Sequence, residues 1–460
     1  MPAIRIALPS PVRTLLAKGA GSAVVSGFLL VAMLTVVGKI VAFVKDAVVA
    51  AKLGTADDLD AFMLVFGFFS FAATVLAGGL PESFVPAYAE WRERRGQRRA
   101  DRLGVQVAVW HLAALLVSGL GLILVAPALI AWATPGFSAA KQGLAVKLLI
   151  GLLPFLLCFG MAHHLSAWLR AGKAFLLAAS APLLVPLGIV IALLMAGDGV
   201  NAWTLVQGTV WGSAAHLGVL LLAHARRLPR SLVWWRCCMR HWEPGLRKVL
   251  RNAAPFLLGG VAFGSAAVVD QTMAAWLSAG SVAVLGYSDK LCAVVLAVTA
   301  GPAADVLFPH FSELVARRDW AGLRKRLFTS AGIIVGAALP MTLILCLFAP
   351  TIVGVLFERG AFGRSDTLRV AEVLRFAAFQ IPFYILGTVA ARVAVSLQAA
   401  RLMLTIAFSA LMLNASLNWL LMGPLGAAGI ALSTVIVHFV CAFATCGVCL
   451  LVIRREEARA

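Results

Sequence analysis

The sequence predicts an all-α polytopic membrane protein, with about twelve transmembrane helices in two pseudo-symmetric six-helix lobes around a central cavity. Three observations predict this fold class. The 460 residues are 62% hydrophobic and only 13% charged. Apolar runs long enough to cross a bilayer recur along the whole chain, and the two halves of the chain resemble each other. A transmembrane β-barrel would show alternating polar and apolar positions instead.

Each expected helix is a run of about 20 or more mostly apolar residues, the length that crosses roughly 30 Å of hydrocarbon. Short polar or Gly- and Pro-containing connections separate the runs. The first run follows a basic segment but continues too far for a cleaved signal peptide, so it is expected to be the first helix. The expected spans are 22–50, 61–88, 104–132, 144–170, 174–196, 202–224, 250–277, 282–312, 327–349, 368–398, 402–422 and 426–453.

Lysine and arginine residues concentrate in alternate connections, notably 92–102, 226–247 and 317–326, and at both ends of the chain. Basic residues near helix ends stay in the cytoplasm, so both termini are expected there. The net charge of +19 is explained by a basic rim that faces an anionic leaflet. No nucleic-acid partner is therefore expected.

The two halves contain corresponding residues at a nearly constant distance, with offsets of 224, 223 and 228 residues. The pairs are Asp46 with Asp270, Pro86 with Pro309 and Pro154 with Pro382. We therefore expect an amino-terminal lobe over 1–230, a cytoplasmic linker over 231–248 and a carboxy-terminal lobe over 249–460. Six helices in each half give a parallel repeat, which is typical of transporters that bind substrate between the halves.

Charged residues interrupt several spans, although a charge near the bilayer centre costs about 2.5 to 3.5 kcal/mol even on a lenient scale. In the segment 37–54 the charged residues fall within an arc of about 140°, so one side of that helix is polar. Such residues usually face a cavity and mark a transport path; snorkelling of Lys45 and Lys52 to the interface is the alternative. The candidate substrate-binding cations are Lys39, Lys45, Lys290 and Arg392. The candidate charge-network or ion-coupling residues are Asp46, Asp60, Asp270 and Asp289.

No catalytic, metal or cofactor site is expected. His163 and His164 lack a nearby acidic or cysteine partner, and the eight cysteines lie mostly in apolar spans, where cysteine behaves as a small hydrophobe. No Gly-rich ATP-binding loop is present. A membrane glycosyltransferase would need an acidic motif, for which 57–60 is a weak candidate. The sequence therefore predicts a transporter and not an enzyme.

Several motifs resemble the MurJ (MviN) family of lipid II flippases, in the multidrug/oligosaccharidyl-lipid/polysaccharide exporter superfamily. They occur in the family's order through most of the chain. The matching residues are Gly38-Lys39, Lys45-Asp46, Ala50, Leu53-Gly54, Asp60-Ala61-Phe62, Phe84-Val85-Pro86, Thr134-Pro135-Gly136-Phe137, Tyr287-Ser288-Asp289-Lys290-Leu291, Leu356-Phe357, Gly360 and Phe362.

The resemblance implies a flippase of the bacterial cytoplasmic (inner) membrane that moves a polyprenyl-diphosphate-linked saccharide, lipid II, from the inner to the outer leaflet by alternating access. Lysines stand where the family has cavity arginines, at 39, 45 and 290. Ala73 and Thr74 replace a basic pair, Gly78 replaces an acidic residue, and twelve helices are expected where the family usually has fourteen.

These departures leave two alternatives open, a flippase for another undecaprenyl-linked oligosaccharide (an exopolysaccharide, capsule or O-antigen unit) and a cation-coupled drug antiporter. The expected partners are the lipid-linked substrate and membrane lipids, and the protein is expected to be monomeric. No cofactor is expected, because coupling to the membrane potential or to a monovalent cation could drive transport. With the interior negative, outward movement of each negative charge is favoured by about 2.3 kcal/mol per 100 mV.

Overall fold

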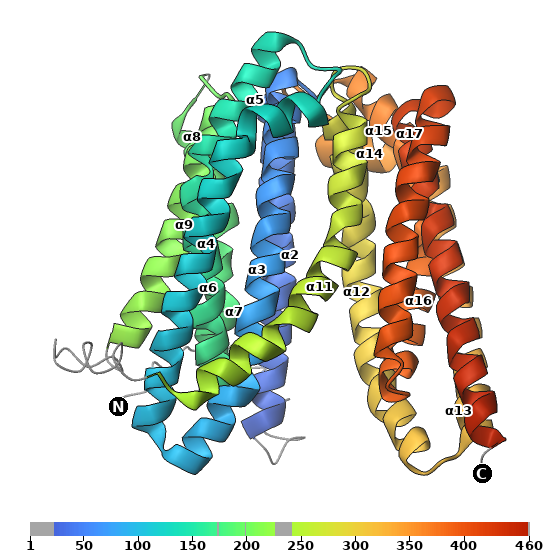
Figure 1. Cartoon of the computed structure of the whole chain (residues 1–460). Helices are drawn as coiled ribbons and strands as arrows, with labels where there is room; N and C mark the ends of the chain where they lie inside the picture. The colour runs from blue at the N-terminus through green and yellow to red at the C-terminus, as the bar shows by residue number, and fades with distance from the viewer. Residues whose placement is uncertain (1–22, 173, 198, 226–241, 459–460) are drawn as a thin grey trace, which may run out of the picture.

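The helices of the protein form two bundles that stand side by side (Figure 1). The computed structural model describes residues 23–172, 174–197, 199–225 and 242–458, and these ranges contain helices but no strand. The predicted all-α, two-lobe fold is confirmed. Most of the predicted linker lies outside the described residues, as do the terminal segments 1–22 and 459–460.

The amino-terminal lobe contains the six predicted spans, two of which are divided. The span predicted at 144–170 is made of two helices that meet at Leu152, and Pro154 lies in the first turn of the second, where a missing N–H costs no hydrogen bond. The elements are α2 (Ala23–Leu53), α3 (Asp57–Arg95), α4 (Gln97–Ala133), α5 (Ala139–Gly151), α6 (Leu153–Ala171), α7 (Phe175–Ser180), the 3₁₀ turn η1 (Ala181–Leu183), α8 (Leu184–Met195) and α9 (Ala202–Ala225).

The carboxy-terminal lobe contains the other six spans. The last element turns sharply at Gly426 (φ 57°) and so includes the two spans predicted at 402–422 and 426–453. The elements are α11 (Pro244–Ala274), α12 (Ser281–Ala316), α13 (Trp320–Leu347), α14 (Ala349–Phe357), α15 (Arg364–Ala377), α16 (Gln380–Ser396) and α17 (Ala400–Glu457).

Among the described helices, length and apolar composition identify fewer membrane spans than the twelve expected. Eight are long and apolar enough to span a membrane, or nine if α15 and α16, which are bent by 42°, form one span. In this count α5 with α6 and α7 with α8 are single spans. The helices α2 and α12, 31 and 36 residues long, are not among the spans counted, and the two arms of α17 are counted as one.

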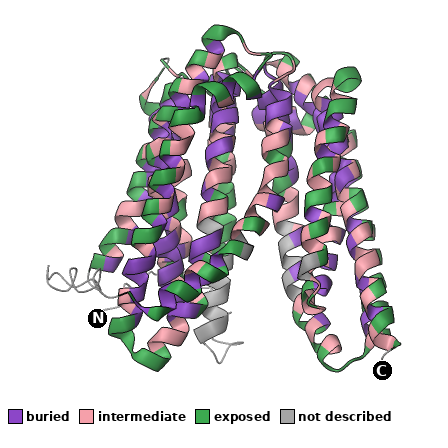
Figure 2. Ribbon diagram, in the orientation of Figure 1, coloured by how far each residue is buried: buried purple, intermediate pink, exposed green. Residues whose placement is uncertain are grey.

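Packing inside the lobes depends on both bulky and very small residues. In the amino-terminal lobe, Trp168 packs edge-on against Phe84 and Tyr88, and buried residues run through both bundles from end to end (Figure 2). A Cβ at Gly188 would approach the Cα of Gly212 to 2.6 Å, so glycine is required where α8 crosses α9. Small residues allow such close contacts between membrane helices, where the hydrophobic effect does not hold helices together.

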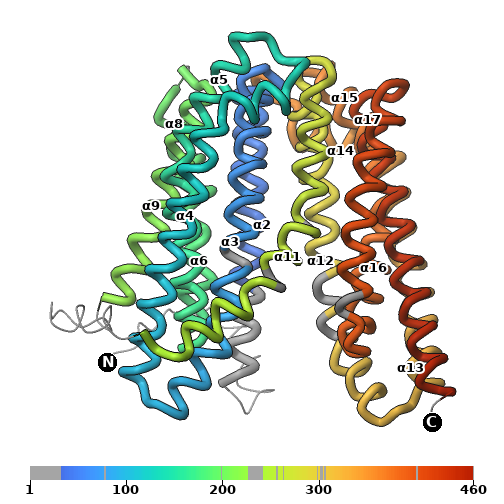
Figure 3. Tube along the Cα trace, viewed as in Figure 1, coloured from blue at the N-terminus to red at the C-terminus, as the bar shows by residue number. Residues whose placement is uncertain are grey.

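The helix α11 crosses from one lobe to the other (Figure 3). Leu246, Val249 and Ala253, in its first half, belong to the buried cluster of the amino-terminal lobe. Near its end, Asp270 is hydrogen-bonded to α17 of the other lobe. The two lobes therefore share one helix as a mechanical link.

The lobes also meet at the end opposite the α3–α4 and α12–α13 turns, which we call the joined end (Figure 1). There the Ala361 N–H donates to the Ala51 carbonyl at 2.8 Å, and the Tyr287 hydroxyl donates to the Gly54 carbonyl at 3.2 Å. Gly54 and Gly360 have φ of 53° and 60°, and a side chain on either would collide with a carbonyl of the other lobe. Both positions therefore require glycine.

Candidate functional site

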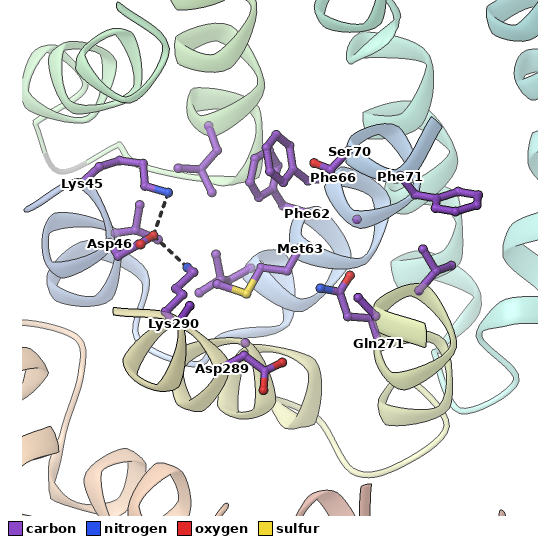
Figure 4. Close-up of a pocket in the computed structure, with 18 of the residues that line it drawn as sticks. Lys45, Asp46, Phe62, Met63, Phe66, Ser70, Phe71, Gln271, Asp289 and Lys290 are labelled. Carbon is purple, nitrogen blue, oxygen red and sulfur yellow. Dashed lines mark ion pairs between the residues drawn. The ribbon is translucent and has the colours of Figure 1, made fainter. Parts of the chain in front are cut away.

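A cavity of about 510 Å³ lies between the lobes, within the range typical of small-molecule sites. Its wall is formed by α2, α3, α8 and α9 from one lobe and by α11 and α12. Most lining residues are apolar, among them Phe62, Met63 and Phe66 (Figure 4). The polar lining residues are Lys45, Asp46, Ser70, Thr74, Gln271, Asp289 and Lys290.

Asp46 joins two lysines from different lobes. Its Oδ1 lies 2.7 Å from Lys45 Nζ and 2.8 Å from Lys290 Nζ (Figure 4). The Asp46 side chain is 9% exposed, whereas those of Lys45 and Lys290 are 21% and 29% exposed. Buried charges need partners, so Asp46 allows two ammonium groups to lie close together at the surface of the cavity.

The cavity is balanced in formal charge, because Lys45 and Lys290 face Asp46 and Asp289. Asp289 is exposed, and the Oε1 atom of Gln271 is buried without a hydrogen-bond partner. The cavity thus offers two ammonium groups to a polar ligand, whereas the Gln271 amide oxygen is packed against Gly67.

Lys39 lies outside this cavity. It is exposed on α2, seven residues before Asp46, which places it about two turns away on nearly the same side of the helix. Among the described residues no ion-pair partner for it is found. The Lys52 ammonium, also exposed, donates to the Gly197 carbonyl at 2.9 Å and is likewise absent from the cavity wall.

Asp60 lies at the joined end, where it connects the lobes. Its Oδ2 accepts from the Gly280 N–H at 2.6 Å and its Oδ1 from the Ala283 N–H at 2.8 Å, which caps the start of α12. Lys141 Nζ lies 3.2 Å from Asp60 Oδ2 and 2.6 Å from Asp57 Oδ1. Asp60 is 1% exposed, so it takes part in the contact between the lobes and not in the cavity.

Asp270 faces the interior of the carboxy-terminal lobe. Its Oδ1 accepts from the side-chain amides of Asn414 and Asn418 at 3.0 and 2.7 Å, and its Oδ2 accepts from the Thr434 hydroxyl at 3.1 Å. The sequence repeat pairs Asp270 with Asp46, yet their surroundings differ, because neutral donors surround Asp270 and lysines surround Asp46. Within the described ranges, no cationic side chain forms an ion pair with Asp270.

Arg392 lies on α16, and its guanidinium is 5.7 Å from the centre of the Phe308 ring. It is not part of the cavity wall. Of the eight predicted site residues, the structure brings Lys45, Asp46, Asp289 and Lys290 together and leaves Lys39, Asp60, Asp270 and Arg392 elsewhere.

Sequence reasoning missed four polar residues around these groups: Lys141, Gln271, Asn414 and Asn418. The two asparagines gave a usable signal, since amides four residues apart on one helix face within an apolar run usually pair inside the bundle. Lys141 follows a loop, and nothing local links it to Asp60. Among the described residues, no group of three or more His, Cys, Asp or Glu could hold a metal ion.

Comparisons with known proteins agree with this architecture. The family profile described as "Lipid II flippase MurJ" matches residues 49–451. A relative from Rhizobium tropici named "Probable lipid II flippase MurJ" is 27% identical over 381 residues, which are 79% of this chain and 69% of the relative.

Two solved structures share the fold. One is titled "Lipid II flippase MurJ, inward closed conformation"; it has a TM-score of 0.75 at 18% identity, and the match covers 94% of this chain and 91% of that one. The other, titled an inward-facing multidrug resistance MATE family transporter of the MOP superfamily, has a TM-score of 0.78 at 16% identity and coverages of 91% and 96%. Since the profile matches most of the sequence, the chain belongs to the lipid II flippase MurJ family.

Proposed function

We propose that the protein moves lipid II, a polyprenyl-diphosphate-linked saccharide, from the inner to the outer leaflet of the bacterial cytoplasmic membrane. The observation that supports this most is the Lys45–Asp46–Lys290 group in the cavity between the lobes. The relative from Rhizobium tropici and the matching structure are both named as lipid II flippases. Both termini are cytoplasmic in this proposal, and a monomer suffices because one chain supplies both walls of the cavity.

The diphosphate competes with Asp46 for the two ammonium groups. Each lysine makes a single short contact with Asp46 Oδ1, so an entering phosphate oxygen can take that place while the carboxylate withdraws. Lysine binds phosphate as a point charge and lacks the two-pronged geometry of arginine. Binding of this kind is easily reversed, which suits release into the other leaflet.

Alternating access follows from the positions of Lys45 and Lys290 on different lobes. The diphosphate would join the lobes through these lysines, and its departure would return both to Asp46. An inside-negative membrane potential favours outward movement by about 2.3 kcal/mol per negative charge per 100 mV. The anionic head group therefore supplies a direction for transport without ATP.

Complementation tests the proposal. The gene is expressed in cells depleted of their own lipid II flippase, and growth and the arrival of lipid II at the outer leaflet are measured. Rescue of both is expected. Failure to rescue, together with restored export in a strain that lacks a capsule or exopolysaccharide flippase, would assign the protein to another undecaprenyl-linked saccharide.

Replacing Lys39 with alanine is expected to weaken substrate capture less than fivefold and to leave the maximal transport rate unchanged. Lys39 is exposed and outside the cavity, and an exposed charge pair contributes only about 0.2 to 1 kcal/mol. Initial rates in proteoliposomes over a range of substrate concentrations separate the two quantities. A loss of maximal rate would place Lys39 in the transport step instead.

We also propose that Asp270 binds a coupling monovalent cation. It is a buried carboxylate held by three neutral groups, and the Oδ1 atom of Asn418 is buried without a hydrogen-bond partner. A cation at Asp270 would neutralise the carboxylate and could use oxygens of the asparagine and threonine side chains as ligands.

Replacing Asp270 with asparagine is expected to abolish stabilisation by the cation. A ligand that binds only the folded state at 100 times its Kd adds about 2.7 kcal/mol of stability, so Tm of the unmodified protein should rise when sodium or lithium replaces choline. The Asp270→Asn protein should show no such rise, whereas Thr434→Ser, which keeps the hydroxyl, should retain it. An unmodified protein whose Tm is insensitive to all of these cations would contradict the assignment.

A further inference from the structure

A groove of about 450 Å³ lies between α12 and α13, close to the turn that joins them. We call it the hairpin groove. Its residues follow the three- and four-residue spacing of a helix face, so each helix contributes one face. They are His310, Glu313, Leu314 and Arg317 of α12 and Gly322, Lys325, Arg326 and Thr329 of α13. None of them lines the cavity between the lobes, so the hairpin groove is a separate space.

The wall of the hairpin groove contains three lysine or arginine side chains and one carboxylate. Arg317 forms an ion pair with Glu313, one turn earlier on α12. For the other two cations, Lys325 and Arg326, no ion pair is found within the described ranges. Their neighbour Arg324 differs, because it pairs with Glu457 at 3.4 Å. The groove therefore offers two adjacent cations that have no acidic partner.

Lys325 and Arg326 lie where the polar end of α13 meets its apolar part. The segment from Leu327 to Leu347 contains no charged residue, and at 1.5 Å per residue it is long enough to cross roughly 30 Å of hydrocarbon. The two cations directly precede this segment, at the level of the lipid head groups. The groove is on the same side of the molecule as the carboxyl terminus (Figure 1), and the proposed orientation places that side in the cytoplasm.

The surface of α13 beyond the groove is apolar and exposed. Phe328 and Ile333 are 58% and 68% exposed. On the face that contains Lys325, the next turns carry Gly332 and Gly336, where a Cβ would point into open space. A smooth apolar surface therefore leads from the two cations toward the middle of the membrane.

We propose that the hairpin groove binds the head group of an anionic phospholipid of the cytoplasmic leaflet, with its phosphate between Lys325 and Arg326. The guanidinium can hold two phosphate oxygens, and the ammonium adds a point charge. The Thr329 hydroxyl in the same wall can donate to a further oxygen. The acyl chains would follow the apolar surface at Gly332 and Gly336. This inference goes beyond the proposed function and does not depend on which substrate is transported.

The occupant is a phospholipid and not a soluble anion or the lipid-linked substrate. A soluble anion would use the cations but gain nothing from the apolar surface beside them, whereas a phospholipid uses both. The lipid-linked substrate binds at Lys290 in the proposed function, and the groove shares no residue with that cavity. Anionic lipids also give the cytoplasmic leaflet a negative surface potential that attracts basic residues at helix ends.

Paired substitutions test the inference. Lys325→Gln with Arg326→Gln removes the two cations of the groove, while Arg318→Gln with Arg324→Gln removes two exposed arginines of the same region that do not line it. The affinity of each purified protein for phosphatidylglycerol is measured in a neutral detergent by native mass spectrometry. Each basic residue beside an anionic lipid contributes about fivefold, so the groove variant should lose about 25-fold. The control variant should lose less than threefold.

A general attraction of the basic turn for negative charge would weaken both variants equally, and that result would overturn the inference. Lys325→Arg with Arg326→Lys keeps both charges and should stay within threefold of the unmodified protein. The four side chains replaced in these variants are exposed, so Tm without added lipid should be the same for all of the proteins. An equal Tm shows that a variant is folded, and normal affinity of a folded groove variant would also overturn the inference.

Competition on the unmodified protein identifies the source of the phosphate. Bound phosphatidylglycerol should be displaced by phosphatidylglycerol with other acyl chains and not by equal concentrations of phosphatidylcholine or inorganic phosphate. Displacement by inorganic phosphate would assign the groove to a soluble anion. Equal displacement by lipid II, unaffected by Lys290→Ala, would assign it to the transported substrate. Either result would overturn the inference and leave the proposed function standing.

Discussion

Replacing Lys290 with alanine is expected to reduce transport of the lipid-linked substrate by about tenfold to a hundredfold. A hydrogen bond to a charged group contributes about 1.5 to 3 kcal/mol, and each 1.4 kcal/mol corresponds to a factor of ten. Lys290 is the ammonium that α12 supplies to the cavity. Without the Lys290 side chain, Lys45 remains paired with Asp46 on the same helix. The opposite wall of the cavity then has no positive group that could hold the diphosphate between the lobes.

The measurement is the rate at which substrate becomes accessible at the outer leaflet, in depleted cells and in proteoliposomes. Lys290→Arg keeps the charge and should retain most of the transport. Lys52→Ala is the matched control, because Lys52 is an exposed lysine of α2 whose hydrogen bond goes to the loop carbonyl of Gly197. Equal rates for Lys290→Ala and Lys52→Ala would remove the lysine pair from the mechanism.

The spans and lobes could be predicted from sequence because hydropathy is a property of short segments. The breaks within spans could not, since they depend on how a helix meets its neighbours. Pro154 marked the start of α6, yet nothing in the apolar run showed that the span would divide into two helices at Leu152. Pro382 likewise lies in the first turn of α16, but the sequence did not predict the 42° bend between α15 and α16.

Predicting the site was harder, because sequence shows that a residue is charged but not which neighbour it meets. Lys45, Asp46 and Lys290 meet as expected for charges at an interface between lobes. Arg392 is positively charged like the two lysines, but its guanidinium packs against the Phe308 ring. Asp46 and Asp270 correspond in the repeat, yet only the second has Asn414 and Asn418 beside it. A repeat thus predicts backbone position, while the partners decide the role of a side chain.

Replacing Asp60 with alanine is expected to open the joined end. Asp60 caps the start of α12 with two short hydrogen bonds and pairs with buried Lys141. Breaking a buried ion pair costs roughly 3 to 5 kcal/mol, and the lower value applies here because Lys141 keeps Asp57 as a partner. A loss of about 3 kcal/mol shifts the equilibrium between closed and open arrangements by roughly a hundredfold. The arrangement with joined lobes should therefore lose most of its population.

Spin labels at Ala140 on α5 and Leu368 on α15, in a variant whose native cysteines are replaced, report the separation of the lobes at this end. In the Asp60→Ala protein, a longer distance between the two labels should become populated, and the distance seen in the unmodified protein should lose population. Asp57→Ala is the matched control: it removes a carboxylate from the same lysine, but one that is 61% exposed and does not cap α12. Asp60→Asn should open the end as well, because one amide oxygen cannot replace two carboxylate oxygens as acceptors for both N–H groups. An unchanged distance in both Asp60 variants would mean that the remaining contacts, chiefly those of Gly54, Ala51 and Ala361, hold the lobes together without Asp60.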